Sequence, residues 1–126
     1  RGLGIGIPDP FDIDFALTAR PTHAAMKAGF GLAFIREMSL LRWSEGKNLT
    51  DPDVVAQAAT RAGWNPDAAC TALASQDYAA NIAADKAHCQ KAKIFGVPFF
   101  IVEDETGSEA FWGQDRWDMV CARVGV

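Results

Sequence analysis

The sequence predicts a mostly helical chain of the α/β class that ends in a small ββα unit. Apolar residues recur at three- and four-residue steps through long stretches of residues 1–93, which is typical of amphipathic helices. From Ile94 onward, two short runs rich in aromatic and β-branched residues flank a turn, which is typical of strands. The spacing then returns to that of a helix. We therefore expect a helical domain over residues 1–93 and a ββα unit over residues 94–126.

The first part of the chain predicts a loop followed by one long helix. Residues 1–21 are expected to be extended, because prolines and glycines interrupt them. A helix is then predicted from Thr22 to Trp43, with Gly46 as its stop signal. Its apolar stripe consists of Met26, Phe30, Ala33, Phe34, Met38 and Leu41, and its solvent side carries Lys27, Arg36, Glu37 and Arg42.

Two shorter helices are predicted from their end signals. Thr50 and Asp53 approximate a capping box, which starts a helix that Gly63 closes. Asn65 followed by Pro66 is a strong N-terminal signal for a third, short helix. Both helices are therefore expected to be short and well capped.

The remaining elements follow in order. A fourth, alanine-rich helix is expected over residues 77–93. Strands are predicted at 97–102 and 109–112, joined through a turn at 104–107. The last helix opens near Asp115, a residue type favoured at helix N-termini. The sparse apolar face of the fourth helix consists of Tyr78, Ile82, Ala83 and Ala87. The apolar face of the last helix consists of Trp117, Val120, Cys121 and Val124.

Composition excludes several classes of function. The net charge of −4 argues against a nucleic-acid surface, and no apolar run approaches the roughly 20 residues that a membrane span needs. Three widely spaced cysteines favour neither a disulfide framework nor a zinc site, so we expect a reducing compartment, the cytoplasm. His23 and His88 lack metal-ligand partners at suitable spacing and are expected to lie at the surface.

Two blocks of residues resemble a known family. They are Phe95-Gly96-Val97-Pro98 and Trp112-Gly113-Gln114-Asp115-Arg116, supported upstream by residues 49–67. Together they resemble the 2-hydroxychromene-2-carboxylate isomerases and the related kappa-class glutathione transferases. These enzymes are DsbA-like: a helical domain is inserted into a thioredoxin-like fold. The first block is shared by the whole DsbA-like group, whereas the second points to the isomerase and kappa branch.

The resemblance implies a glutathione site at four positions. Val97 would bind through its backbone and Pro98 through a cis peptide bond. Gln114 and Asp115 would hold the γ-glutamyl end, with the Asp115 carboxylate facing the ammonium group. The family often has Asn or Ser where Gln114 stands. Glutathione is therefore the expected cofactor, and no metal is expected.

The resemblance also implies a mechanism and a missing part. In these isomerases a serine holds the glutathione sulfur as a thiolate, which adds reversibly to a conjugated double bond of an intermediate of aromatic (naphthalene) catabolism. That serine belongs to an N-terminal βαβ half, which is not found here. We therefore expect a fragment that is inactive alone, because its serines do not stand in the matching context; they are Ser39, Ser44, Ser75 and Ser108.

The substrate is expected to be a small aromatic molecule, although its identity cannot be derived. Trp112 lies beside the glutathione positions, and the long helix roofs the substrate pocket in the family, so Phe30 and Phe34 are further candidate pocket residues. Without a central strand, the strand at 97–102 presents an edge, which favours a homodimer.

Two alternatives stay open. A DsbA-like thiol–disulfide oxidoreductase would need a Cys-x-x-Cys pair upstream, and the Trp112–Arg116 block disfavours it. A non-catalytic helical remnant that dimerises would need a genuine start immediately before Arg1. An upstream serine would instead support the isomerase.

Overall fold

A computed structural model describes residues 4–126, so Arg1–Leu3, the start of the predicted entry loop, lie outside the described residues. The chain divides into two compact units, residues 1–84 and residues 85–126. We call them the helical unit and the hairpin unit, and each is described by itself. The division lies earlier in the chain than the boundary after Lys93 that the sequence predicts.

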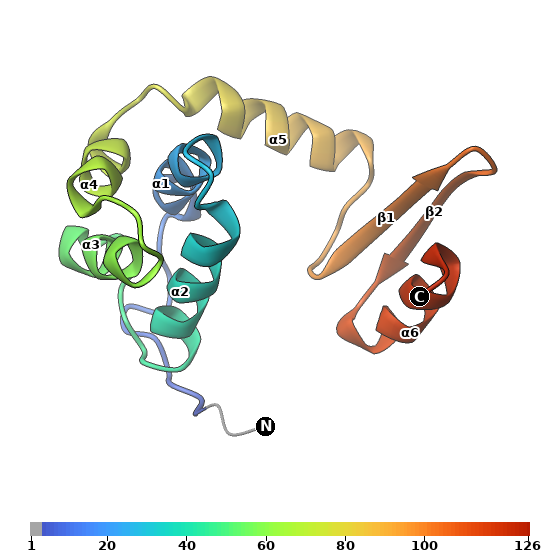
Figure 1. The fold of residues 1–126 in the computed structure, drawn as a ribbon, viewed down its shortest axis with the longest axis horizontal. Helices are drawn as coiled ribbons and strands as arrows, with labels where there is room; N and C mark the ends of the chain where they lie inside the picture. Colours follow the sequence, from blue (N-terminus) through green and yellow to red (C-terminus); the bar gives the residue numbers. More distant parts are fainter. Residues whose placement is uncertain (1–3) are drawn as a thin grey trace. The chain divides into compact units, whose positions relative to one another are not determined.

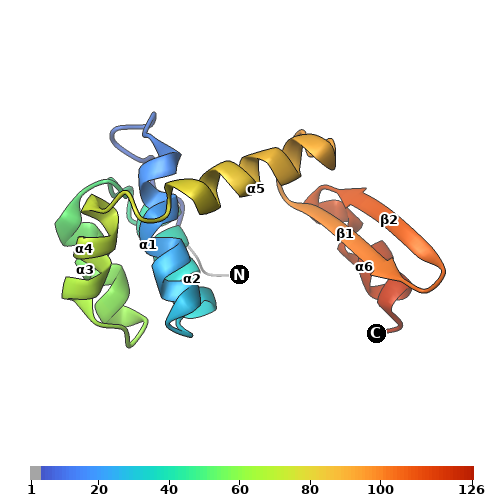
Figure 2. The ribbon, with the colours of Figure 1, turned by 90° about the horizontal axis from the view of Figure 1, so that it is seen from above.

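The helical unit contains four helices that pack together, α1 (Phe15–Lys27), α2 (Gly31–Trp43), α3 (Pro52–Arg61) and α4 (Pro66–Ala74) (Figures 1 and 2). Helix α5 (Ala79–Lys91) begins in this unit and ends in the next. The hairpin unit continues with β1 (Phe99–Asp104), β2 (Gly107–Trp112), a 3₁₀ turn η1 (Gln114–Arg116) and α6 (Trp117–Val124).

The predicted single helix Thr22–Trp43 is wrong, because the chain turns at Ala28–Phe30 and forms α1 and α2 instead. Gly29 has a φ of +86°, a left-handed conformation that ends a helix and that glycine adopts without a Cβ penalty. The predicted entry loop is also too long. Asp14 caps α1 by accepting from the Ala16 N–H at 2.9 Å, so the helix begins at Phe15.

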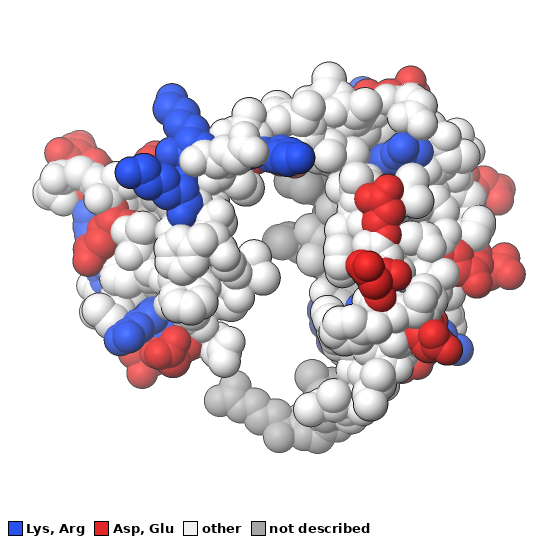
Figure 3. All heavy atoms as spheres, turned by 180° about the vertical axis from the view of Figure 1, so that it is seen from behind, with Lys and Arg blue, Asp and Glu red and all other residues white. Residues whose placement is uncertain are grey.

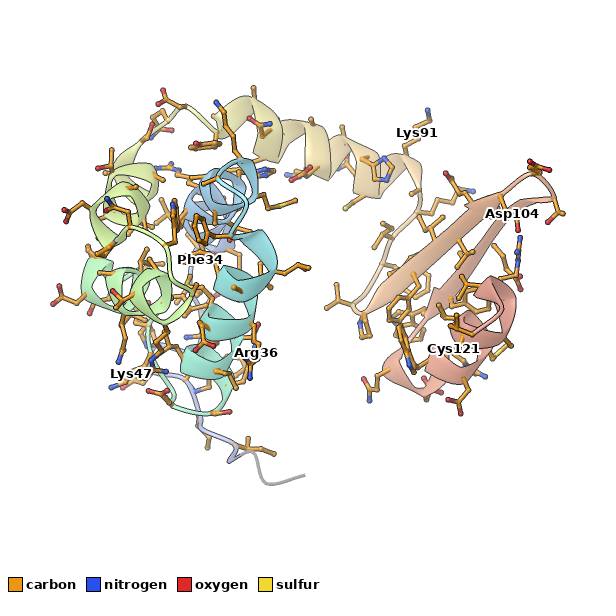
Figure 4. The ribbon with its side chains drawn as sticks, viewed as in Figure 1. Phe34, Arg36, Lys47, Lys91, Asp104 and Cys121 are labelled. Atoms are coloured by element: carbon orange, nitrogen blue, oxygen red, sulfur yellow. The ribbon has the colours of Figure 1, made fainter. Side chains whose placement is uncertain are left out.

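The turn changes which apolar residues are buried. Phe34, Met38 and Leu41 lie in the core as predicted, whereas Met26, Phe30 and Ala33 are exposed. The core is built around the edge-to-face contact of Phe34 with Trp64, whose ring centroids are 5.4 Å apart. Figure 4 shows Phe34 among the helices of this unit. The other large buried apolar residues are Leu49, Val55 and Leu73.

The helical period predicts Arg42 on the solvent side of its helix. In the structure Arg42 is buried instead, with 1% of its surface exposed. Its guanidinium donates to the carbonyl oxygens of Pro10 at 2.8 Å, of Phe11, and of Lys47 at 3.3 Å. Extended loop segments leave carbonyls without a ladder partner, and a buried cation can satisfy several of them at once. Arg42 therefore fastens the N-terminal segment to the end of α2.

Helix caps in this unit follow the sequence closely. Asn65 caps α4 as predicted, accepting from the N–H groups of Asp67 at 2.9 Å and of Ala68 at 3.2 Å. The cap of α3 is Asp51 rather than Thr50, because Pro52 takes the first helical position and holds the residue before it extended.

Helix α5 is shorter than predicted, and none of its residues is buried. Of its predicted apolar face, Tyr78 lies just before α5 and packs against the core of the helical unit, whereas Ile82, Ala83 and Ala87 are not buried. No described helix is both long enough and apolar enough to cross a membrane. Acidic and basic side chains are interspersed on the face of the molecule in Figure 3, and no basic stripe crosses that face.

The hairpin unit is an antiparallel two-stranded ribbon with α6 against one face (Figure 1). The register runs from Phe99 opposite Trp112 to Asp104 opposite Gly107, so both strands begin two residues away from their predicted starts. The ring of Phe100 lies 5.5 Å from that of Trp117 on α6, and Val120 is buried on the same helix. The helix predicted at the C-terminus is therefore present from Trp117.

An exposed polar cluster joins α6 to the turn of the hairpin. Arg123 is paired with Asp104, donates to the Thr106 hydroxyl at 3.1 Å, and lies 3.3 Å from the Glu109 carboxylate. Thr106 also donates to Asp104 from its hydroxyl and its backbone N–H. These donors hold the pKa of Asp104, labelled in Figure 4, well below its usual range; the hydrogen bond from Arg123 contributes most.

We expect Arg42→Met to destabilise the protein by about 3 kcal/mol, because carbonyls that now accept from a buried cation would lose their donors. Chemical denaturation measures this loss. Arg36→Met is the matched control on the same helix, because the Arg36 side chain is 77% exposed. Equal stability of the two variants would contradict the anchoring role of Arg42.

The hairpin cluster predicts a dependence of stability on pH. A carboxyl whose pKa is depressed by folding stabilises the folded state fully above its unfolded pKa of about 3.9, and that contribution is lost as pH falls toward the folded pKa. We expect Arg123→Gln to raise the pKa of Asp104 toward its usual range, as measured by carboxyl-carbon NMR during acid titration. Arg116→Gln is the control, and an unchanged Asp104 midpoint in Arg123→Gln would refute the assignment.

Candidate functional site

The hairpin brings the four predicted glutathione positions to one end of its sheet. Phe99 pairs with Trp112, and the Gly113 N–H donates to the Pro98 carbonyl at 3.0 Å. The residues just before β1 and those just after β2 therefore lie next to each other. We call Val97, Pro98, Gln114 and Asp115 the proline site.

Val97 supplies a backbone N–H and carbonyl without a partner in residues 4–126, next to Pro98, whose carbonyl accepts from Gly113. The bond between them is cis, as predicted. Val97 is 87% exposed, and within residues 4–126 neither its N–H nor its carbonyl has a protein hydrogen-bond partner. An extended peptide could therefore pair with Val97 as an added strand.

Gln114 and Asp115 supply polar side chains on the other side of the proline site. Asp115 lies in the 3₁₀ turn that directly precedes α6. The sequence predicts that Asp115 opens the helix, but the N-cap residue is Arg116. The Asp115 side chain is 72% exposed, and its contact is with the Arg116 Nε at 3.6 Å. An exposed pair at this distance is weak, so the carboxylate can engage another cation. Gln114 is also exposed.

Aromatic side chains flank the proline site. The rings of Phe95 and Trp112 lie 5.0 Å apart, with 72% and 54% of these residues exposed. Gly96 makes this approach possible, because a Cβ there would lie 2.5 Å from the Trp112 Nε1. Sequence reasoning singles out Trp112 but not Phe95, although Phe95 stands in the same block as Pro98.

The two pocket candidates from the helical unit differ in exposure. Phe34 has no exposed surface and packs in the core, whereas Phe30 is 36% exposed at the start of α2. The role of Phe30, Phe34 and Trp112 in a substrate pocket stays a prediction.

Nucleophilic and metal-binding residues do not gather at the proline site. Each cysteine in the described residues is free, and Cys121, labelled in Figure 4, lies on α6. Within residues 4–126, no three His, Cys, Asp or Glu side chains are placed to hold a metal ion. Ser75 caps the Asp77 N–H at 3.0 Å, and His23 stacks on Tyr78. The four residues of the proline site therefore present hydrogen-bonding groups of the kind that a peptide-like ligand uses, and none of the four is a Ser or Cys.

Comparison with known proteins gives one finding. The profile of the DSBA-like thioredoxin domain family matches residues 3–125 of the chain. No curated protein matches the sequence.

We expect Gly96→Ala to displace the Trp112 indole, because the added Cβ would overlap its Nε1, and to cost about 1–2 kcal/mol of stability. The indole N–H resonance of Trp112 in a ¹⁵N-correlated spectrum measures the displacement. Gly4→Ala is the control, since a Cβ there meets no atom within 4 Å. An unmoved indole resonance in Gly96→Ala would contradict the close approach.

Proposed function

The chain belongs to the DSBA-like thioredoxin domain family, and from this premise we propose that it carries the glutathione-binding part of a glutathione-dependent enzyme. The activity we propose is that of a 2-hydroxychromene-2-carboxylate isomerase or of a kappa-type glutathione transferase. The helical unit would be the domain inserted into the thioredoxin-like fold. The free cysteines fit a reducing cytoplasm, where glutathione is abundant.

The observation that carries this proposal is the free Val97 peptide group beside the Asp115 carboxylate. Glutathione is a tripeptide with an extended cysteinyl peptide unit and an ammonium group at its γ-glutamyl end. Val97 would pair with the peptide unit, and Asp115 would face the ammonium group. The two groups belong to chain segments that the hydrogen bond between Gly113 and Pro98 holds together, which supports binding of one short ligand by both.

The residues of this chain would orient the cofactor and leave chemistry to its sulfur. Bound glutathione supplies a thiolate, which can add reversibly to a conjugated double bond so that the bond rotates as a single bond. Val97 and Asp115 would fix the tripeptide at two points, and the exposed rings of Phe95 and Trp112 would flank it. The resemblance places a thiolate-holding serine in a βαβ unit, which residues 4–126 do not contain.

One observation favours a second candidate. Phe95, Val97 and Trp112 expose apolar surface around a free peptide group, which suits an unfolded polypeptide and hence a thiol–disulfide oxidoreductase. That activity needs a Cys-x-x-Cys pair, whereas the cysteines here are widely spaced. The carboxylate of Asp115 favours glutathione, because it matches the ammonium group of the γ-glutamyl end.

We expect glutathione to cause saturable NMR shifts at Val97, Gln114 and Asp115, and Asp115→Ala to weaken binding about tenfold through loss of a charge-assisted hydrogen bond. Asp118→Ala, one turn further along, is the control and should bind normally.

The dipeptide Cys-Gly separates the two candidates, because it retains the thiol and lacks the γ-glutamyl group. Weaker binding of Cys-Gly than of glutathione supports the glutathione site. Equal binding of both ligands, or equal affinities of the wild type and Asp115→Ala, would contradict it.

A further inference from the structure

The helical unit contains a groove that the proposed function does not use. It lies between α1 and α4, has a volume of about 400 Å³, and is lined on both sides by alanines. This volume lies within the usual range for small-molecule sites, about 300–1,000 Å³. We call it the alanine groove. Its apolar walls are Ala24, Ala28, Ala68 and Ala72, together with Trp64 and Tyr78, and its polar lining is Lys27, Thr71, Ser75 and Asp77.

The walls of the groove are rigid before any ligand arrives. Alanine has no side-chain rotamers to lose, so ordering the walls carries no side-chain entropy cost. Trp64 is fixed by its edge-to-face contact with Phe34 in the core. Tyr78 lies parallel to His23, with ring centroids 6.2 Å apart and an interplanar angle of 8°. A flat apolar group can therefore enter without rearranging the walls.

Trp64 supplies a hydrogen-bond donor that a ligand can use. The residue is 8% exposed and lines the groove, and its indole N–H donates to no protein acceptor among residues 4–126. Among these residues the fully buried side-chain nitrogen without a partner is the Arg42 Nε, so the Trp64 indole N–H is in contact with solvent. An oxygen of a ligand in the groove would replace that water contact.

Two opposite charges stand at the rim. Lys27 and Asp77 both line the alanine groove, and neither side chain forms an ion pair with a residue in 4–126. The same two residues also line an adjoining depression with His23 and Asn81. A free ammonium and a free carboxylate beside one apolar groove complement a ligand that carries both charges.

We propose that the alanine groove binds a free α-amino acid with an aromatic side chain. The aromatic ring lies between the alanine walls, and the ligand carboxylate accepts from Lys27 and from the Trp64 indole. The ligand ammonium group pairs with Asp77. This site lies wholly in the helical unit and does not depend on glutathione binding.

L-Phenylalanine is the probe, titrated into the full chain and followed by the indole N–H resonance of Trp64. We expect a saturable shift that 3-phenylpropionate, without the ammonium group, and phenethylamine, without the carboxylate, reproduce at least fivefold more weakly. Equal binding of the three compounds would overturn the amino-acid assignment. No shift with phenylalanine would overturn the site.

Variants of the groove residues give a second test of the same site. Ala68 is exposed and lines the alanine groove, so Ala68→Leu should fill the groove and abolish phenylalanine binding. Ala74 is an exposed residue of the same helix that does not line the groove, so Ala74→Leu should leave binding unchanged. Lys27→Gln and Asp77→Asn should each weaken phenylalanine binding about fivefold, with Lys47→Gln as the control. Unchanged binding in Ala68→Leu would overturn the placement of the ligand.

Discussion

The pairing of Phe99 with Trp112 fixes the position of every residue of the proline site. Because side chains alternate between the faces of a strand, a slip of one residue would move Phe100 away from Trp117 and separate Pro98 from Gly113. The register is held at both ends of the hairpin. At one end Arg123 joins α6 to the turn, and at the other the Gly113 N–H donates to Pro98.

A different contact organises the helical unit. Trp64 makes an edge-to-face contact with Phe34 and also lines the alanine groove. One side chain therefore belongs to both the core and the surface. Trp64 lies in the loop between α3 and α4, and its contact with Phe34 in the core gives the groove a fixed wall there. The shape of the groove is therefore set by the packing of α1, α3 and α4 around Phe34.

Features specified by neighbouring residues could be predicted from the sequence, and features that depend on distant residues could not. The cap at Asn65 was predicted because it depends on adjacent residues, whereas the cis bond at Pro98 was predicted from the resemblance to a known family. The split at Gly29 was missed, because the apolar spacing continues across the turn while the backbone does not. Arg42 was misplaced because its burial depends on carbonyls of Pro10 and Phe11, about thirty positions earlier.

The same distinction applies to the sites. The residues of the proline site are named from the sequence because they stand in two motif blocks. The structure shows that the two blocks lie at one end of the hairpin, and their binding of glutathione stays a prediction. The alanine groove was not predicted, because alanine at helical spacing is the commonest helix interior and carries no chemical signal by itself. Only the fold shows that these alanines line one groove beside Trp64 and two charged residues, Lys27 and Asp77, that form no ion pair within residues 4–126.

Both sites use polar groups that the fold leaves accessible to a ligand. Such groups are in contact with water, so a ligand gains affinity there only where its own hydrogen bonds or ion pairs replace those water contacts. In the hairpin unit these are the Val97 peptide and the Asp115 carboxylate, and in the helical unit they are the Trp64 indole and the Lys27 and Asp77 charges. Because the two sets lie in separate compact units, a mutation that abolishes the proposed binding at one site should leave the proposed binding at the other intact.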